Sequence, residues 1–205
     1  MSPDGMVVML SSDAEFEVKD NGKTFGDVSE DDWYYDAVAF AVSHELFFGT
    51  NETEFSPEGN MTRGMAAEVL YRLAGRPQAG NNVFTDVSEN GYYSDAVAWA
   101  YGKGILSGVG DGRFMPDDHV TKEQLAVILY MYGQSMGMEN VFGAYSGMEG
   151  YVDVSPWAAA SVDWAVKNGV MTHNVYNGQS LQVPASRADV AEMLYNYVKY
   201  VCADK

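Results

Sequence analysis

Hydrophobic positions recur along this chain with the period of an amphipathic helix, and the same set of positions occurs three times. Each copy has an alanine, a leucine and a tyrosine at positions i, i+3 and i+4, which form one stripe of a helix. These columns are Ala67/Ala126/Ala191, Leu70/Leu129/Leu194 and Tyr71/Tyr130/Tyr195. Shorter apolar columns precede them at Val38/Val97/Val162 and Ala41/Ala100/Ala165. The pattern therefore predicts three copies of a helix–loop–helix unit.

Fixed spacings support the repeat. The tripeptide Asp-Val-Ser begins at Asp27, Asp86 and Asp153, and an aromatic residue that leads an alanine-rich run follows it in each copy. The intervals from Phe40 to Arg63, from Trp99 to Lys122 and from Trp164 to Arg187 are 23 residues each. Because Phe40, Trp99 and Trp164 lie on the periodic apolar face, we expect them in the core.

Capping residues predict where the helices end. Thr62, Thr121 and Ser186 precede the second helices as N-caps, and Gln124 and Asp189 complete capping boxes in units two and three. For the first helices we expect caps from the Asp-Val-Ser serine or from Asp31 or Asp32, with Pro156 in a first turn. Glycines suit the C′ position at Gly75, Gly104 and Gly169.

A basic residue stands at the first position of each second helix, at Arg63, Lys122 and Arg187. The helix dipole makes a cation there unfavourable by roughly 0.3–1 kcal/mol. The repetition of an unfavourable residue beside the backbone N–H groups of a helix N-terminus suggests that these positions help to hold an anion.

Loops and boundaries complete the organisation. The connections 49–60 and 108–119 share a glycine start and a Phe-x-Pro turn, whereas 173–184 keeps the length but begins with His173. Because one helical hairpin cannot bury its own apolar face, we expect a single all-α domain, a pseudo-three-fold bundle with three prongs. The expected segments are a connector at 1–24, units at 25–77, 83–137 and 151–201, a linker at 138–150 and a tail at 202–205.

Composition narrows the function. Of the 205 residues, 47% are hydrophobic and 20% charged, as in a globular protein, and the net charge of −17 opposes binding to nucleic acid. No apolar stretch reaches the ~20 residues of a membrane span, and the first 24 residues do not resemble a signal peptide, which leaves a cytosolic protein or a piece of a longer precursor. Cys202 is the only cysteine. We expect no cofactor, no metal site and no catalytic activity, because the motifs for them are absent.

The combined pattern resembles the S-layer homology domain, three in tandem, over about residues 25–201. The family's Thr-Arg-Ala-Glu signature reads Thr62-Arg63-Gly64-Met65, Thr121-Lys122-Glu123-Gln124 and Ser186-Arg187-Ala188-Asp189 here. The resemblance implies a three-pronged bundle that anchors a protein at the bacterial cell surface. It also implies binding of secondary cell-wall polysaccharide, commonly through a pyruvylated N-acetylmannosamine end, in grooves between adjacent units.

The resemblance further implies roles for individual residues. Arg63, Lys122 and Arg187 match the positions that hold the pyruvyl carboxylate, Asp27, Asp86 and Asp153 match the acidic position, and Gly49 and Gly108 match the loop glycine. His173 replaces that glycine in unit three. Since Gly49 and Gly108 lie in the same units as Arg63 and Lys122, we expect these two cations to matter more for binding than Arg187.

Two alternatives stay open at this point. Trp33, Tyr92 and Trp157, each near a helix start, suit either core packing or contact with a sugar ring, and the three aspartates suit either turn stabilisation or ligand contact. The whole chain also suits a protein-interaction or self-assembly module of a surface layer, whose binding would depend on apolar surface rather than on the three cations.

Overall fold

The computed structural model describes residues 21–138, 153–173 and 180–203, and over these residues the secondary structure is helical, with isolated β-bridges only. The helices are α1 (Tyr35–Ser43), α2 (Arg63–Leu73), α3 (Ser94–Gly102), α4 (Lys122–Ser135), α5 (Ala159–Lys167) and α6 (Arg187–Ala203). The expected all-α class and the order of six helices are confirmed.

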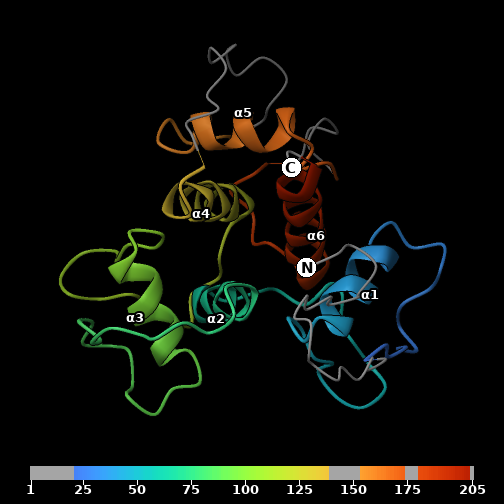
Figure 1. Ribbon diagram of the computed structural model, residues 1–205, viewed down its shortest axis with the longest axis horizontal. Helices are drawn as coiled ribbons and strands as arrows, with labels where there is room; N and C mark the ends of the chain where they lie inside the picture. Colours follow the sequence, from blue (N-terminus) through green and yellow to red (C-terminus); the bar gives the residue numbers. More distant parts are fainter. Residues whose placement is uncertain (1–20, 139–152, 174–179, 204–205) are drawn as a thin grey trace, which may run out of the picture.

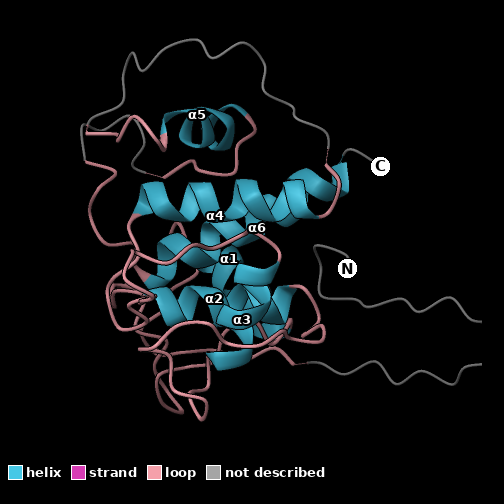
Figure 2. Cartoon of the chain, turned by 90° about the vertical axis from the view of Figure 1, so that its left-hand side faces the viewer, coloured by secondary structure: helices cyan, strands magenta, loops and turns pink. Residues whose placement is uncertain are grey.

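Helices pair between units. The main helix contacts join α1 to α6, α2 to α3 and α4 to α5, so the first helix of each unit packs on the second helix of the preceding unit. Figure 1 shows α2, α4 and α6 around the centre and α3, α5 and α1 outside them as three prongs. From the side, the connecting loops gather mainly beside one end of α2 and α4 (Figure 2). Each prong therefore needs two units to form.

A closed ring of backbone hydrogen bonds joins the three units. The N–H of Met61 donates to Ala185 O (2.9 Å), the N–H of Ala185 to Val120 O (2.8 Å), and the N–H of Val120 to Met61 O (3.0 Å). These residues hold the same position in their units, directly before the caps of α2, α4 and α6, and all three are buried. The ring gives the expected pseudo-three-fold arrangement a structural basis.

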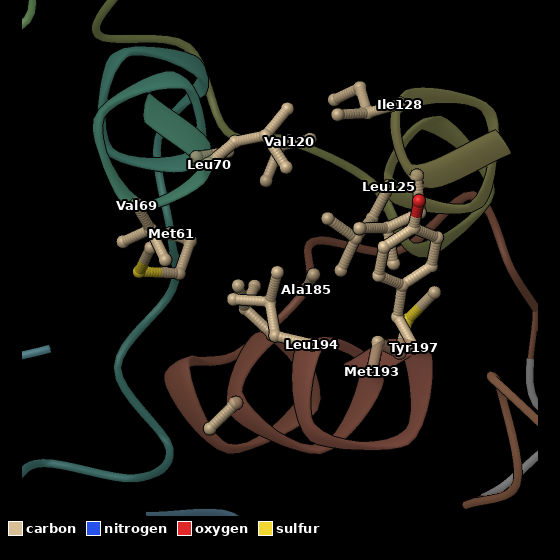
Figure 3. Packing of buried hydrophobic residues seen from close by; sticks show 14 of the residues in the cluster. Met61, Val69, Leu70, Val120, Leu125, Ile128, Ala185, Met193, Leu194 and Tyr197 are labelled. Atoms are coloured by element: carbon tan, nitrogen blue, oxygen red, sulfur yellow. The ribbon is translucent and has the colours of Figure 1, made fainter. Parts of the chain in front are cut away.

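The core lies between the three central helices. Leu70, Leu125, Ile128, Leu194 and Tyr197 face one another around the ring residues Met61, Val120 and Ala185 (Figure 3). A second set of aromatic pairs fixes the prongs, with ring centroids 5.3–5.4 Å apart: Phe40 on Tyr195, Trp99 on Tyr71 and Trp164 on Tyr130. The prediction that Phe40, Trp99 and Trp164 are core residues is confirmed.

The caps of the second helices are as predicted. The N–H of Met65 donates to Thr62, Thr121 and Gln124 form a full capping box, and Ser186 and Asp189 exchange the equivalent bonds. The C′ glycines have the left-handed backbone expected of them, with φ of 79° at Gly75, 70° at Gly104 and 66° at Gly169.

The predicted caps of the first helices are wrong. These helices begin at Tyr35, Ser94 and Ala159, and their N-cap residues make no side-chain capping bond. An additional turn precedes α1, in which Asp32 accepts the N–H of Ser29 at 2.7 Å and the N–H of Tyr35 donates to Asp32 O. Pro156 likewise lies in the turn before α5 rather than in its first turn.

Candidate binding grooves between units

Arg63 reaches from the start of α2 into the loop of unit two. Its Nε donates to Phe114 O and its Nη2 to Ser107 O, both at 2.9 Å, and the guanidinium lies 4.6 Å from the centre of the Phe114 ring. Arg187 makes the same contacts in unit one, to Phe55 O (2.7 Å) and Phe48 O (2.6 Å). Each arginine therefore fixes the loop of the next unit.

Each of these two guanidinium groups donates only some of its N–H groups to the protein. Nε and one Nη2 hydrogen are bound to carbonyl groups, whereas Nη1 donates to no acceptor among the described residues. Burial lowers the pKa of Arg63 and Arg187 below the ordinary arginine value, yet an arginine keeps its charge at neutral pH. A fixed, partly desolvated cation with free donors is suited to bind a carboxylate.

The N-terminal N–H groups of the second helices do not contribute to this site. The N–H groups of Arg63 and Gly64 donate to Asp118 O and Pro116 O, and the corresponding groups at the starts of α4 and α6 also donate to carbonyls of the next unit's loop. The expectation that these groups help to hold an anion is therefore wrong. The surrounding carbonyl oxygens also explain why a cation is tolerated at these helix starts.

Asp27 and Asp86 stabilise the same loops from the other side. Asp27 accepts the N–H groups of Phe55 (2.8 Å) and Ser56 (2.7 Å), and Asp86 accepts those of Phe114 and Met115 (both 2.8 Å). Burial alone would raise the pKa of Asp86, but these backbone hydrogen bonds hold it below its ordinary value. The two carboxylates thus act as turn stabilisers. In unit three, the corresponding Asp153 is exposed. Gln179, at the position of the Phe55 N–H that Asp27 accepts, lies outside the described residues.

Gly49 and Gly108 occupy positions with no room for a side chain. A Cβ on Gly49 would lie 2.4 Å from Asn51 O and 2.5 Å from the Phe25 ring, and one on Gly108 would lie 2.6 Å from both Arg113 O and the Phe84 ring. These glycines allow the loop to close tightly over the aromatic residue that precedes each Asp-Val-Ser tripeptide.

We expect Gly108→Ala to lower the free energy of unfolding by about 1–3 kcal/mol, because overpacking displaces the loop backbone or the Phe84 ring. The matched control is Gly102→Ala at the end of α3, where a Cβ meets nothing within 4 Å. Alanine should be neutral or slightly stabilising there. Thermal melts of both variants test this, and equal melting temperatures would contradict the packing argument.

Two grooves lie between units beside these loops. The Gly49 groove, of about 220 Å³, has Arg187, Gly49 and Tyr92 in its lining, so all three units contribute to it. The Gly108 groove, of about 400 Å³, has Arg63, Gly108 and Trp157 at the matching places. Tyr92 is 60% and Trp157 59% exposed, which excludes core packing for these two aromatic residues.

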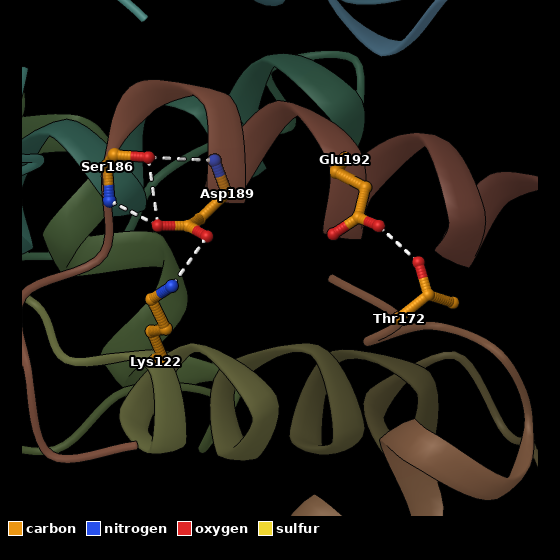
Figure 4. Close-up of polar contacts among 5 residues, drawn as sticks. All are labelled: Lys122, Thr172, Ser186, Asp189 and Glu192. Atoms are coloured by element: carbon orange, nitrogen blue, oxygen red, sulfur yellow. Dashed lines mark hydrogen bonds and ion pairs between the residues drawn. The ribbon is translucent and has the colours of Figure 1, made fainter. Parts of the chain in front are cut away.

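The third junction has a different chemistry. The ring of Trp33 stacks on that of His173, with centroids 3.6 Å apart and an angle of 6° between their planes. Lys122 Nζ contacts Asp189 Oδ1 at 2.8 Å in a buried ion pair, and Thr172 donates to Glu192 nearby (Figure 4). At this junction, Lys122 and Trp33 correspond to the cation and the aromatic residue that line the other two grooves. Both are already in contact with protein side chains here, Lys122 with Asp189 and Trp33 with His173.

In the structure, the cation beside each loop glycine is not the one that the sequence predicted. The sequence pattern pairs Arg63 with Gly49 and Lys122 with Gly108, because they share a unit. The arginine of each groove instead comes from the preceding unit, which pairs Arg187 with Gly49 and Arg63 with Gly108. The expectation that Lys122 outranks Arg187 rested on the wrong pairing.

Two residues of the Gly49 groove, Glu68 and Arg72, were not among the predicted site residues. Arg72 Nε contacts Glu68 Oε1 at 2.8 Å, and Arg72 Nη1 donates to Leu46 O. The signal was their i, i+4 spacing on α2, which places oppositely charged side chains on one helix face. Glu123 was also missed; its carboxylate accepts the N–H and the hydroxyl of Ser155 and so joins α4 to unit three.

Two further features, a metal site and a membrane-spanning helix, are absent from the described residues. Across the described residues, no group of three His, Cys, Asp or Glu side chains is arranged to hold a metal ion. The helices in the described part of the chain are too short or too polar to cross a membrane.

Comparison with known proteins identifies the family of the first two units. The sequence model of the S-layer homology domain matches residues 24–67 and 83–126, so these segments are S-layer homology repeats. The domain is a non-catalytic anchoring module of cell-surface proteins.

Relatives of several kinds carry a similar segment. The chain is 30% identical over 86% of its length to an exoglucanase, XynX, of Acetivibrio thermocellus, and 28% identical over 82% of its length to a surface-layer 125 kDa protein of Lysinibacillus sphaericus. A cellulosome-anchoring protein of A. thermocellus is 31% identical over 40% of the chain. The chain spans 16%, 14% and 20% of these relatives' own lengths. The family and these relatives indicate an extracellular location at the cell surface or cell wall.

Proposed function

We propose that this chain is a non-catalytic anchor that binds an anionic, pyruvylated cell-wall polysaccharide in the Gly49 and Gly108 grooves. The observation that carries the proposal is the repeated geometry of Arg187 and Arg63. Each guanidinium is fixed by two loop carbonyls and an aromatic ring, and each keeps Nη1 for a ligand at a groove between units.

A ketal-linked pyruvate offers a planar carboxylate on a sugar ring. The carboxylate matches the fork of the guanidinium, and the C–H face of the ring matches the exposed aromatic side chain, Tyr92 or Trp157, contributed by the following unit. The net charge of −17 disfavours anionic polymers in general, so attraction is confined to the grooves.

We also propose that residues 151–201 form a third repeat of the same family. The backbone ring of Met61, Val120 and Ala185 and the cap of Ser186 and Asp189 support this assignment. At the third junction Lys122 is paired with Asp189, and His173 stands where the open grooves have glycine. The proposal therefore includes two binding grooves for each chain, with the third junction as a structural joint.

Sedimentation with purified bacterial wall tests the proposal. We expect the chain to pellet with intact wall and to stay in the supernatant when the pyruvyl groups have been removed, because only the pyruvyl carboxylate matches the groove cations. A chelator and Cys202→Ser should leave binding unchanged. Equal pelleting with both walls would favour the self-assembly or protein-interaction alternative.

A further inference from the structure

The two open grooves share an arginine, a glycine and an exposed aromatic residue, and they differ in charge on the wall that the second helix contributes. On the helical wall, Glu68 and Arg72 of α2 correspond to Val127 and Met131 of α4, since each pair lies five and nine residues after the arginine or lysine that opens its helix. On the opposite wall, the phenol of Tyr92 corresponds to the indole of Trp157.

The Gly49 groove has a polar wall. Glu68 is 7% exposed, and its Oε1 is held by Arg72 (2.8 Å) and Arg76 (3.1 Å), whereas its Oε2 accepts no hydrogen bond among the described residues. Arg72 uses Nε and Nη1 for Glu68 and Leu46 O and lies 4.7 Å from the Phe48 ring. The wall therefore presents a fixed carboxylate acceptor and a fixed guanidinium donor, the pair of groups that recognises neighbouring hydroxyl groups.

The Gly108 groove has an apolar wall and nearly twice the volume. Val127, Ile128 and Met131 line it, with Gln124 as the polar side chain of the helical face. A hydroxyl group bound against Val127, Ile128 and Met131 would lose hydrogen bonds to water without a replacement from these side chains, whereas a methyl group would gain contact.

We infer that the two grooves select different sugar substituents: the Gly49 groove a residue with free hydroxyl groups beside the carboxylate, and the Gly108 groove a residue with an apolar substituent such as an N-acetyl methyl. This inference rests on the proposed function, because it assumes that the guanidinium binds the carboxylate in both grooves. Glu68 and Val127 are then the positions that determine specificity, and a polymer with both kinds of residue would engage both grooves of one chain.

Methionine methyl groups report on each groove in the wild-type chain. Met65 lines the Gly49 groove and Met131 the Gly108 groove, and they are similarly exposed at 37% and 36%. Nuclear magnetic resonance of the protein labelled with 13C at its methionine methyl groups, assigned through Met65→Leu and Met131→Leu, follows both grooves in one titration. The probes are 4,6-pyruvylated mannose and 4,6-pyruvylated N-acetylmannosamine.

We expect the N-acetylated probe to shift Met131 at a concentration about tenfold lower than the mannose probe does, and the mannose probe to be preferred at Met65, because one methyl group or one unpaired hydroxyl changes affinity by about this factor or more. The isosteric Val127→Thr should reduce the preference at Met131 and leave the Met65 titration unchanged. If both methyl signals shift with the same affinity for both probes, the inference is wrong and the proposed function stands. If neither probe shifts either signal, the proposed function fails, and the inference fails with it.

Discussion

Residues 80–205 expressed alone should not fold. This fragment lacks α1 and α2, so α6 loses its main helix partner and keeps only α4, and α3 loses its partner as well. Trp99 would lose its contact with Tyr71, and Val120 and Ala185 would lose their backbone hydrogen bonds to Met61. Because removal of a buried aromatic side chain of this size costs about 3–5 kcal/mol by itself, the combined losses are comparable to the whole stability of a typical domain, about 5–15 kcal/mol.

Circular dichroism melts of the fragment and the full chain check this expectation. The full chain should unfold in one cooperative transition, whereas the fragment should show no sharp transition or should aggregate. Addition of residues 1–79 as a separate chain should restore the transition, because the missing contacts lie between units. A sharp, independent transition of residues 80–205 would contradict the account.

The sequence was sufficient to predict the helices, the caps of the second helix of each unit and the buried faces. The stripe of Ala126, Leu129 and Tyr130 defines a buried face by its period alone, and the capping box of Thr121 and Gln124 lies within four residues. Such local features depend on backbone geometry that every helix shares, so no partner needs to be known.

The sequence pattern could not predict which residues of the chain contact each other. The period that places Phe40 on an apolar face does not say that it faces Tyr195, 155 residues later in the chain. The arginines posed the same difficulty, because the loop that Arg63 reaches is 44 to 51 residues away and belongs to another unit. The pattern within single units therefore paired Arg63 and Lys122 with the wrong loops and did not point to Glu68 and Arg72.

Arg63→Ala and Arg187→Ala should each abolish one binding site. Truncation of one partner of a desolvated, hydrogen-bonded charge pair costs about 2–5 kcal/mol, which is a loss in affinity of roughly 30-fold to several thousandfold in that groove. Both variants should also be less stable, because each arginine holds two loop carbonyls. Arg187→Lys keeps the charge without the fork and should bind with intermediate affinity.

Lys122→Ala is the matched control for these variants. Its ammonium group is 2.8 Å from Asp189 Oδ1, and removal leaves a buried carboxylate without its cation. We expect a loss of about 3 kcal/mol in stability, at the lower end for a broken buried ion pair because Asp189 keeps its bonds from Ser186. The number of saccharides bound should stay the same. Lys122→Ala should therefore lower stability without loss of a binding site, whereas each arginine variant should lose one site.

Calorimetric titration of a pyruvylated wall saccharide tests the central claim, that guanidinium groups in two grooves between units bind the carboxylate. The wild-type chain and Lys122→Ala should bind two saccharides each, Arg63→Ala and Arg187→Ala one each, and the double arginine variant none. The titrations are done below the melting temperature of every variant, confirmed by circular dichroism. Affinity and stoichiometry near those of the wild type in the double arginine variant would contradict the account.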